Sequence, residues 1–119
     1  MFALNFYSAV FTPALRDSRK TLTIRLGDKR DKYEEGQLVW ITVGQRYGIR
    51  QRIFTAVIDR VETKLLREVS PREIERDNPA LREHADLIDF LSKIYARKVA
   101  PEDVVTVIHF SRVADAKEE

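Results

Sequence analysis

The chain has 119 residues, of which 44% are hydrophobic, 34% charged and 9% aromatic. This length suits one compact domain, and the apolar fraction is too high for a disordered chain. The formal net charge of +2 does not by itself indicate nucleic acid, and the absence of cysteine excludes disulfides, thiolate nucleophiles, iron–sulfur clusters and cysteine zinc sites.

The first half is predicted to form strands. Residues 2–7 are short and aromatic, and residues 21–26 (TLTIRL) alternate polar and apolar side chains with the period of two that a half-buried strand requires. Residues 38–43 (LVWITV) and 52–63 (RIFTAVIDRVET) are rich in β-branched and aromatic residues. The loop 44–48 between them, bounded by two glycines, predicts a hairpin.

The second half changes period. Ser70, Pro71 and Glu73 form the pattern of a capping box with proline at the first helical position, so a short helix is expected there. A second helix is expected to start at Asn78-Pro79, with one apolar face made of Leu81, Ala85, Ile88, Leu91 and Tyr95. Residues 103–113 return to a strand. The pattern predicts an α+β fold, a small, partly closed β-barrel of about five to six strands with a helical insert before the last strand.

Three other side chains are interpreted as structural. Trp40 lies in an apolar run and is expected in the core. His84 borders the apolar face of the second helix, and His109 is expected to be a core histidine with its hydrogen bonds satisfied.

The segment 16–32 carries seven basic and three acidic residues, a local charge of +4. Thr21, Thr23 and Arg25 share one face of the predicted strand, where hydroxyls and a guanidinium suit a polar or phosphate-bearing ligand. The alternative is a solvated strand face in a highly charged protein.

The residues 18–25 (SRKTLTIR) resemble the G-R-K-T-x-T-x-R signature of ASCH domains, a branch of the PUA-like superfamily, and are most similar to small bacterial N4-acetylcytidine amidohydrolases. The resemblance continues through residues 33–39 (YEEGQLV), 75–78 (ERDN, for E-x-E-N) and the last strand, and covers roughly residues 16–113. Here Ser18 replaces the motif glycine, Gln37 an aspartate, Asp77 a glutamate and His109 a glutamate.

This resemblance implies Lys20 as general base, Thr23 as nucleophile and Asp77 as proton donor. A lysine acts as a base only when burial or nearby cations lower its pKa, for which Arg19 and Arg25 are candidates. Lys20 and Thr23 would point to opposite faces of a regular strand, so we predict a bend at the start of this strand. Asp77 could instead favour the start of the following helix electrostatically.

Arg19, Thr21 and Arg25 are the expected substrate-binding residues, and the expected partner is a nucleoside or RNA. The alternative is a non-catalytic RNA-binding module. It would bind RNA through a basic, aromatic hairpin that contains Arg46, Tyr47, Arg50 and Arg52. A basic adaptor for a protein partner is a third possibility.

No cofactor, metal or membrane is expected, and the expected location is cytoplasmic. Residues 1–113 are expected to form a single domain, followed by a flexible charged tail at 114–119.

Overall fold

The computed structural model describes residues 2–45 and 48–113, so the predictions for Arg46, Tyr47 and the tail 114–119 lie outside the described residues. In these residues the fold is a five-stranded sheet with three α-helices; the sheet and the two later helices were predicted, whereas the helix Thr12–Arg16 was not. The strands are β1 (Ala3–Phe6), β2 (Leu22–Leu26), β3 (Leu38–Gly44), β4 (Arg50–Leu65) and β5 (Val104–Arg112). The helices are α1 (Thr12–Arg16), α2 (Pro71–Asp77) and α3 (His84–Tyr95), with 3₁₀ turns at Ala9–Phe11 and Leu66–Glu68.

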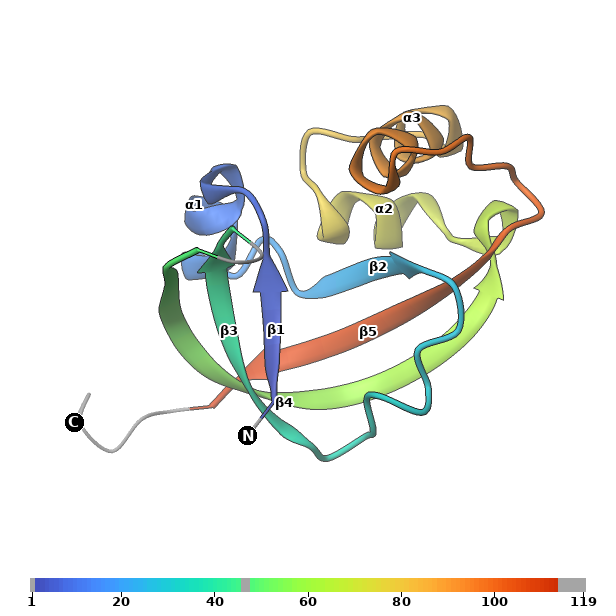
Figure 1. Cartoon of the computed structure of the whole chain (residues 1–119). Coiled ribbons are helices and arrows are strands. Elements are labelled where there is room, and N and C mark those ends of the chain that lie inside the picture. The colour runs from blue at the N-terminus through green and yellow to red at the C-terminus, as the bar shows by residue number, and fades with distance from the viewer. Residues whose placement is uncertain (1, 46–47, 114–119) are drawn as a thin grey trace.

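The sheet curls into a half-barrel that is open between its two edge strands. The strand order is β1-β3-β4-β5-β2, with β1 parallel to β3 and the other neighbours antiparallel. The long strand β4 curves beneath the others in Figure 1 and pairs with both β3 and β5. Its pairing shifts register between Ile58 and Arg60, an irregularity of the kind that bends a strand and increases its twist.

Two cores lie on the two sides of the curled sheet. One fills the curl and includes Leu4, Ile41 and Ile58, all fully buried. The other lies between the sheet and the helices α2 and α3, which Figure 1 shows together above β2. The alternation predicted for residues 21–26 determines which side chains of β2 are buried, because Leu22, Ile24 and Leu26 belong to this second core.

The predicted cap of α2 is confirmed. The Ser70 hydroxyl accepts a hydrogen bond from the Glu73 amide at 3.1 Å, and the Glu73 carboxylate accepts one from the Ser70 amide at 2.9 Å. The predicted start of the next helix is wrong: α3 begins at His84, because Asn78 is extended and its side chain accepts a hydrogen bond from the Ala80 amide, which forms a turn.

The expected apolar face of α3 is also partly wrong, since Leu87 and Leu91 are its buried residues and Ala85 is exposed. Trp40 likewise lies outside the core, with 36% of its surface exposed. It alternates along β3 with the fully buried Val39 and Ile41 and therefore points outward. The described helices include none long and apolar enough to cross a membrane.

Candidate active site

The chain reaches β2 through a sharp turn that ends at Lys20. Ser18 adopts φ 63°, a left-handed conformation that glycine adopts without strain, which accounts for glycine at this position of the motif. The Lys20 amide then donates to the Ala14 carbonyl at 2.9 Å, and the Thr21 amide donates to the Arg76 carbonyl at 3.2 Å. Lys20 and Thr21 therefore precede the strand, which begins at Leu22.

Because of this turn, the side chains of Lys20 and Thr23 can lie on the same side of the chain. The two side chains would diverge on a regular strand, but Lys20 lies before β2 and both side chains line the same cavity. The predicted bend at the start of the strand is what brings them together.

The Lys20 ammonium is the central feature of this cavity, and its side chain is only 1% exposed. Its Nζ donates to the Leu22 carbonyl at 3.0 Å, to the Asp77 carbonyl at 2.6 Å and to Asp77 Oδ1 at 3.0 Å. The ring centroids of Phe6 and Phe11 lie 4.7 and 5.1 Å from Nζ. One carboxylate, two carbonyls and two aromatic rings thus replace the water that a surface lysine would have.

Burial lowers the pKa of Lys20 below its ordinary value, since removal from water disfavours the charged form. Asp77 opposes this shift, by its charge and its hydrogen bond, and the nearby Arg25 adds to it. Of the two cations expected to contribute, Arg25 is the one near Lys20, and Arg19 is exposed and paired with Asp17.

Asp77 connects α2 to β2. It is the last residue of α2, its side chain is 4% exposed, and its Oδ1 accepts hydrogen bonds from Lys20 Nζ and the Ile24 amide, both at 3.0 Å. Asp77 does not lie at the start of the following helix, since α3 begins at His84, so it does not favour that start electrostatically. Helix α2 therefore places a buried carboxylate against the lysine.

The cavity has a volume of about 220 Å³ and combines a few polar groups with aromatic walls. Its polar side chains include Lys20, Thr23, Arg25 and Asp77, so four of the predicted site residues come together here. The aromatic lining was not predicted from the sequence; it consists of Phe6, Tyr7, Phe11, Phe90 and Tyr95. The aromatic residues at 2–11 were a signal that could have indicated part of it.

Arg25 spans the open side of the half-barrel. Its Nη2 donates to the Asn5 carbonyl of β1 at 3.2 Å, its Nε donates to Thr23 Oγ1 at 3.3 Å, and its guanidinium lies 5.4 Å from the Phe6 ring centroid. Because β1 and β2 are the two edges of the sheet, one side chain bridges a gap that no backbone ladder closes.

Two expected substrate-binding residues do not line the cavity. Arg19 is exposed and pairs with Asp17 at 2.8 Å. Thr21 accepts a hydrogen bond from Arg76 Nη1 at 3.3 Å and faces a separate hollow, which His109 also lines. The expectation that Thr21 and Thr23 share one face is wrong for this pair because the chain bends before the strand begins at Leu22.

The described part of the predicted RNA-binding hairpin forms the start of β4. Arg50 and Arg52 are exposed, and the Arg52 guanidinium lies 5.1 Å from the Trp40 ring centroid. The base of this hairpin contacts the cavity wall, since Asn5 Nδ2 donates to the Gly44 carbonyl at 3.0 Å.

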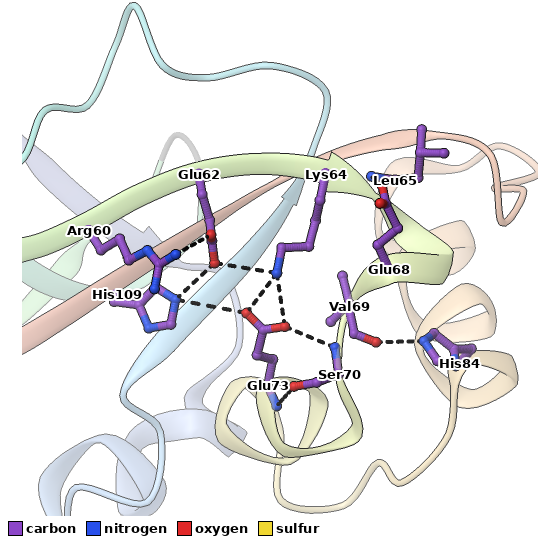
Figure 2. Close-up of polar contacts among 10 residues, drawn as sticks. All are labelled: Arg60, Glu62, Lys64, Leu65, Glu68, Val69, Ser70, Glu73, His84 and His109. Carbon is purple, nitrogen blue, oxygen red and sulfur yellow. Dashed lines mark hydrogen bonds and ion pairs between the residues drawn. The ribbon is translucent and has the colours of Figure 1, made fainter.

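His109 differs from its expectation. It is half-buried, and its Nε2 is buried without a hydrogen-bond partner among the described residues. Instead, Nε2 faces Glu62 Oε1 at 3.6 Å and Glu73 Oε2 at 3.9 Å, because the first turn of α2 places a carboxylate over this part of β5 (Figure 2). We call this cluster the Glu62–Glu73–His109 triad; each residue offers one donor atom that could ligate a metal ion, and these atoms lie within 4.8 Å of one another.

Comparison with known proteins identifies the fold. No protein-family model and no curated protein matches the chain. Solved structures do match: the ASCH domain from Lactobacillus crispatus JV V101 has a TM-score of 0.67 at 12% identity, covering 91% of this chain and 77% of that one. Protein EF3133 from Enterococcus faecalis V583, of family DUF984, has a TM-score of 0.63 at 18% identity, covering 95% and 81%. The hypothetical protein PH0355 has a TM-score of 0.67 at 13% identity, covering 94% and 98%.

The chain therefore has the fold of an ASCH domain, a small α+β half-barrel, as the resemblance at 18–25 led us to expect.

Proposed function

We propose that the protein is an amidohydrolase that recognises a modified nucleobase and removes the acetyl group of N4-acetylcytidine. The observation that carries the proposal is the buried Lys20, which shares one cavity with the Thr23 hydroxyl and the Asp77 carboxylate. The lowered pKa of Lys20 makes its amine available as a base. A buried lysine without a functional role would be a costly core residue. Perturbed titratable groups of this kind are concentrated at functional sites.

In the proposed reaction, the Lys20 ammonium first loses a proton to solvent, which its lowered pKa favours, and the neutral amine then removes the proton of the Thr23 hydroxyl, which attacks the acetyl carbonyl. The C–N bond breaks, the acetyl group stays on Thr23 as an ester, and the exocyclic amine of cytidine leaves with a proton. Asp77 delivers this proton, and its contact with Lys20 Nζ at 3.0 Å provides the path by which the proton taken from Thr23 reaches it. Water then hydrolyses the ester and restores the hydroxyl.

The shorter acid at position 77 is compatible with this role. The Asp77 carbonyl lies 2.6 Å from Lys20 Nζ, so the backbone at the end of α2 approaches β2 closely enough for an aspartate to reach the lysine. Arg25 donates to Thr23 Oγ1 and so orients the hydroxyl oxygen, while its charge favours the alkoxide that forms there.

The shape of the cavity supports a base-sized substrate. Its volume of about 220 Å³ is below the ~300 Å³ at which pockets for drug-sized ligands begin. The aromatic side chains Phe11 and Phe90 on its wall meet edge to face, with centroids 6.0 Å apart. Such rings suit the face of a nucleobase, and the neighbouring ribose would remain near the mouth.

The test is incubation of the purified protein with N4-acetylcytidine, with cytidine release followed by chromatography. We expect Thr23→Ala to abolish release and Thr23→Ser to restore part of it. The control is Thr63→Ala, a half-buried threonine of β4 that does not line the cavity. Absence of release by the folded wild-type protein, or unchanged release by folded Thr23→Ala, would contradict the proposal.

A non-catalytic RNA-binding module is the second candidate, favoured by the exposed Trp40 and the Arg52 guanidinium against its ring. An exposed aromatic ring beside a cation is suited to stacking on single-stranded bases. The test is binding of a single-stranded RNA at several salt concentrations, since each phosphate contact adds about 0.7 to the log–log slope for single strands.

Charge reversal of Arg50 and Arg52 is expected to weaken RNA binding and to reduce that slope, with nucleoside hydrolysis unaffected. Equal loss of both activities would contradict separate sites. An RNA affinity that does not depend on salt would exclude this candidate and leave the protein-binding adaptor.

A further inference from the structure

We propose that the Glu62–Glu73–His109 triad binds a divalent transition-metal ion, with zinc as the reference ion. This site is separate from the cavity, since none of its three residues lines it. The inference is independent of amide hydrolysis.

The three ligands come from three elements and converge. Glu62 lies on β4, Glu73 on the first turn of α2 and His109 on β5, and one donor atom from each lies within 4.8 Å of the others. Figure 2 shows their side chains pointing toward one another. Ligands at about 2.0–2.2 Å from tetrahedral zinc lie about 3.3 Å apart. The observed separations of 3.6 and 3.9 Å from His109 Nε2 to the two carboxylates need to shorten by only a few tenths of an ångström.

The outer oxygen of each carboxylate is held by a neighbouring group. Glu62 Oε2 pairs with Arg60 at 2.9 Å, and Glu73 Oε1 accepts the Ser70 amide at 2.9 Å in the capping box. Glu62 Oε1 and Glu73 Oε2 face His109 Nε2, and both also contact Lys64 Nζ. Such supporting contacts are what orients the ligands of a metal site.

The buried Nε2 of His109 is the observation that points to a cation. It has no hydrogen-bond partner among the described residues and faces two carboxylate oxygens. An imidazole nitrogen and two carboxylate oxygens, each an atom type that ligates metal ions, therefore converge here, and none of the described residues donates or accepts a hydrogen bond at His109 Nε2. Imidazole with two carboxylates is a donor set that suits zinc and similar ions.

The ammonium of Lys64 is a cation that already lies near the two carboxylates. Its Nζ lies 3.4 Å from Glu62 Oε1 and donates to Glu73 Oε1 and Oε2 at 3.2 and 3.3 Å, and the side chain remains 21% exposed. The ammonium therefore bridges the two carboxylates. The metal ion must displace this ammonium, whose long flexible stem allows it to move into solvent. Lys64 is therefore a competitor, and its removal is expected to strengthen metal binding.

The test is calorimetric titration of tag-free protein with Zn²⁺, with Co²⁺ absorbance as a second readout because tetrahedral Co²⁺ absorbs strongly in the visible range. We expect one ion per chain, and a loss of affinity of about ten- to a hundredfold or more in His109→Gln and Glu73→Gln. Glutamine at position 73 preserves the capping box. Lys64→Met is expected to bind more tightly than the wild-type protein.

The matched control is His84→Gln, because His84 is the other histidine and its Nε2 is engaged with the Val69 carbonyl at 2.6 Å. This variant is expected to bind zinc as the wild type does. The proposal is overturned if neither the wild-type protein nor Lys64→Met binds Zn²⁺ at millimolar concentration, or if folded His109→Gln retains wild-type affinity.

Discussion

Removal of the Asp77 carboxylate is expected to destabilise the fold far more than removal of an exposed acid. Asp77 Oδ1 accepts hydrogen bonds from Lys20 Nζ and from the Ile24 amide, both at 3.0 Å, and the pair is almost completely buried. Asp77→Ala leaves a buried ammonium with only carbonyl acceptors and a buried amide without its partner. Breaking a buried pair in this way costs about 3–5 kcal/mol, out of a total of about 5–15 kcal/mol for a domain.

The assay is urea unfolding at pH 7, followed by the fluorescence of the single tryptophan, Trp40, and by circular dichroism. Asp77→Asn keeps an oxygen acceptor and is expected to lose less than Asp77→Ala. The matched control is Asp89→Ala, which removes an exposed ion pair with Lys93 at 3.1 Å and is expected to cost below about 1 kcal/mol. An equal loss in Asp77→Ala and Asp89→Ala would refute the assignment of a buried ion pair.

The pH dependence gives a second check on Lys20. Because its pKa is lowered in the folded protein, the unfolded chain binds more protons between that lowered value and the ordinary value of about 10.4. Stability contributed by this group therefore rises with pH across that window. In Asp77→Ala the pKa of Lys20 is expected to fall further, because Asp77 no longer stabilises the charged form. The loss in the free energy of unfolding caused by Asp77→Ala is therefore expected to shrink as the pH is raised. The double variant Lys20→Met/Asp77→Ala, which has no buried charge, is expected to lose less than the sum of the single losses.

Three further outcomes are expected. Ser70→Ala removes the cap of α2 and is expected to lower the free energy of unfolding by about 1 kcal/mol in urea; a change near zero would contradict the capping box. Gly44→Ala would place a Cβ 2.4 Å from the Ile49 carbonyl oxygen, so a thermal melt is expected to show a loss of about 1–3 kcal/mol, and an unchanged melting temperature would contradict this close approach. Thr21→Ala is expected to retain cytidine release within about twofold, because Thr21 lies outside the cavity; complete loss would mean that Thr21 contacts the substrate.

The sequence predicted those elements whose signals are local. The alternation at 21–26 determined which side chains of β2 reach the helical core, and the Ser70–Glu73 box located the start of α2. The start of α3 was missed because the turn at Asn78 depends on a side-chain hydrogen bond that competes with helix formation. Trp40 was misplaced because a continuous apolar run does not reveal which residues of a strand face the core.

The site depends on contacts that local patterns do not contain. Lys20 and Asp77 are 57 residues apart, and their contact follows from the packing of α2 on β2. The motif resemblance supplied this pair, whereas nothing in the sequence indicated that Phe90 of α3 would share a cavity wall with Phe11. The position of His109 between two carboxylates likewise requires three elements to be assembled first.

The Arg25 bridge between β1 and β2 spans the open side of the half-barrel without a backbone ladder. In a closed barrel the bore is set by strand number and shear, so it changes only when the whole sheet is rebuilt. Here the length of one side chain spans the gap beside the cavity. A substitution at position 25 is therefore expected to alter the width of this opening while the sheet keeps its register, so that a single codon can change what the cavity admits.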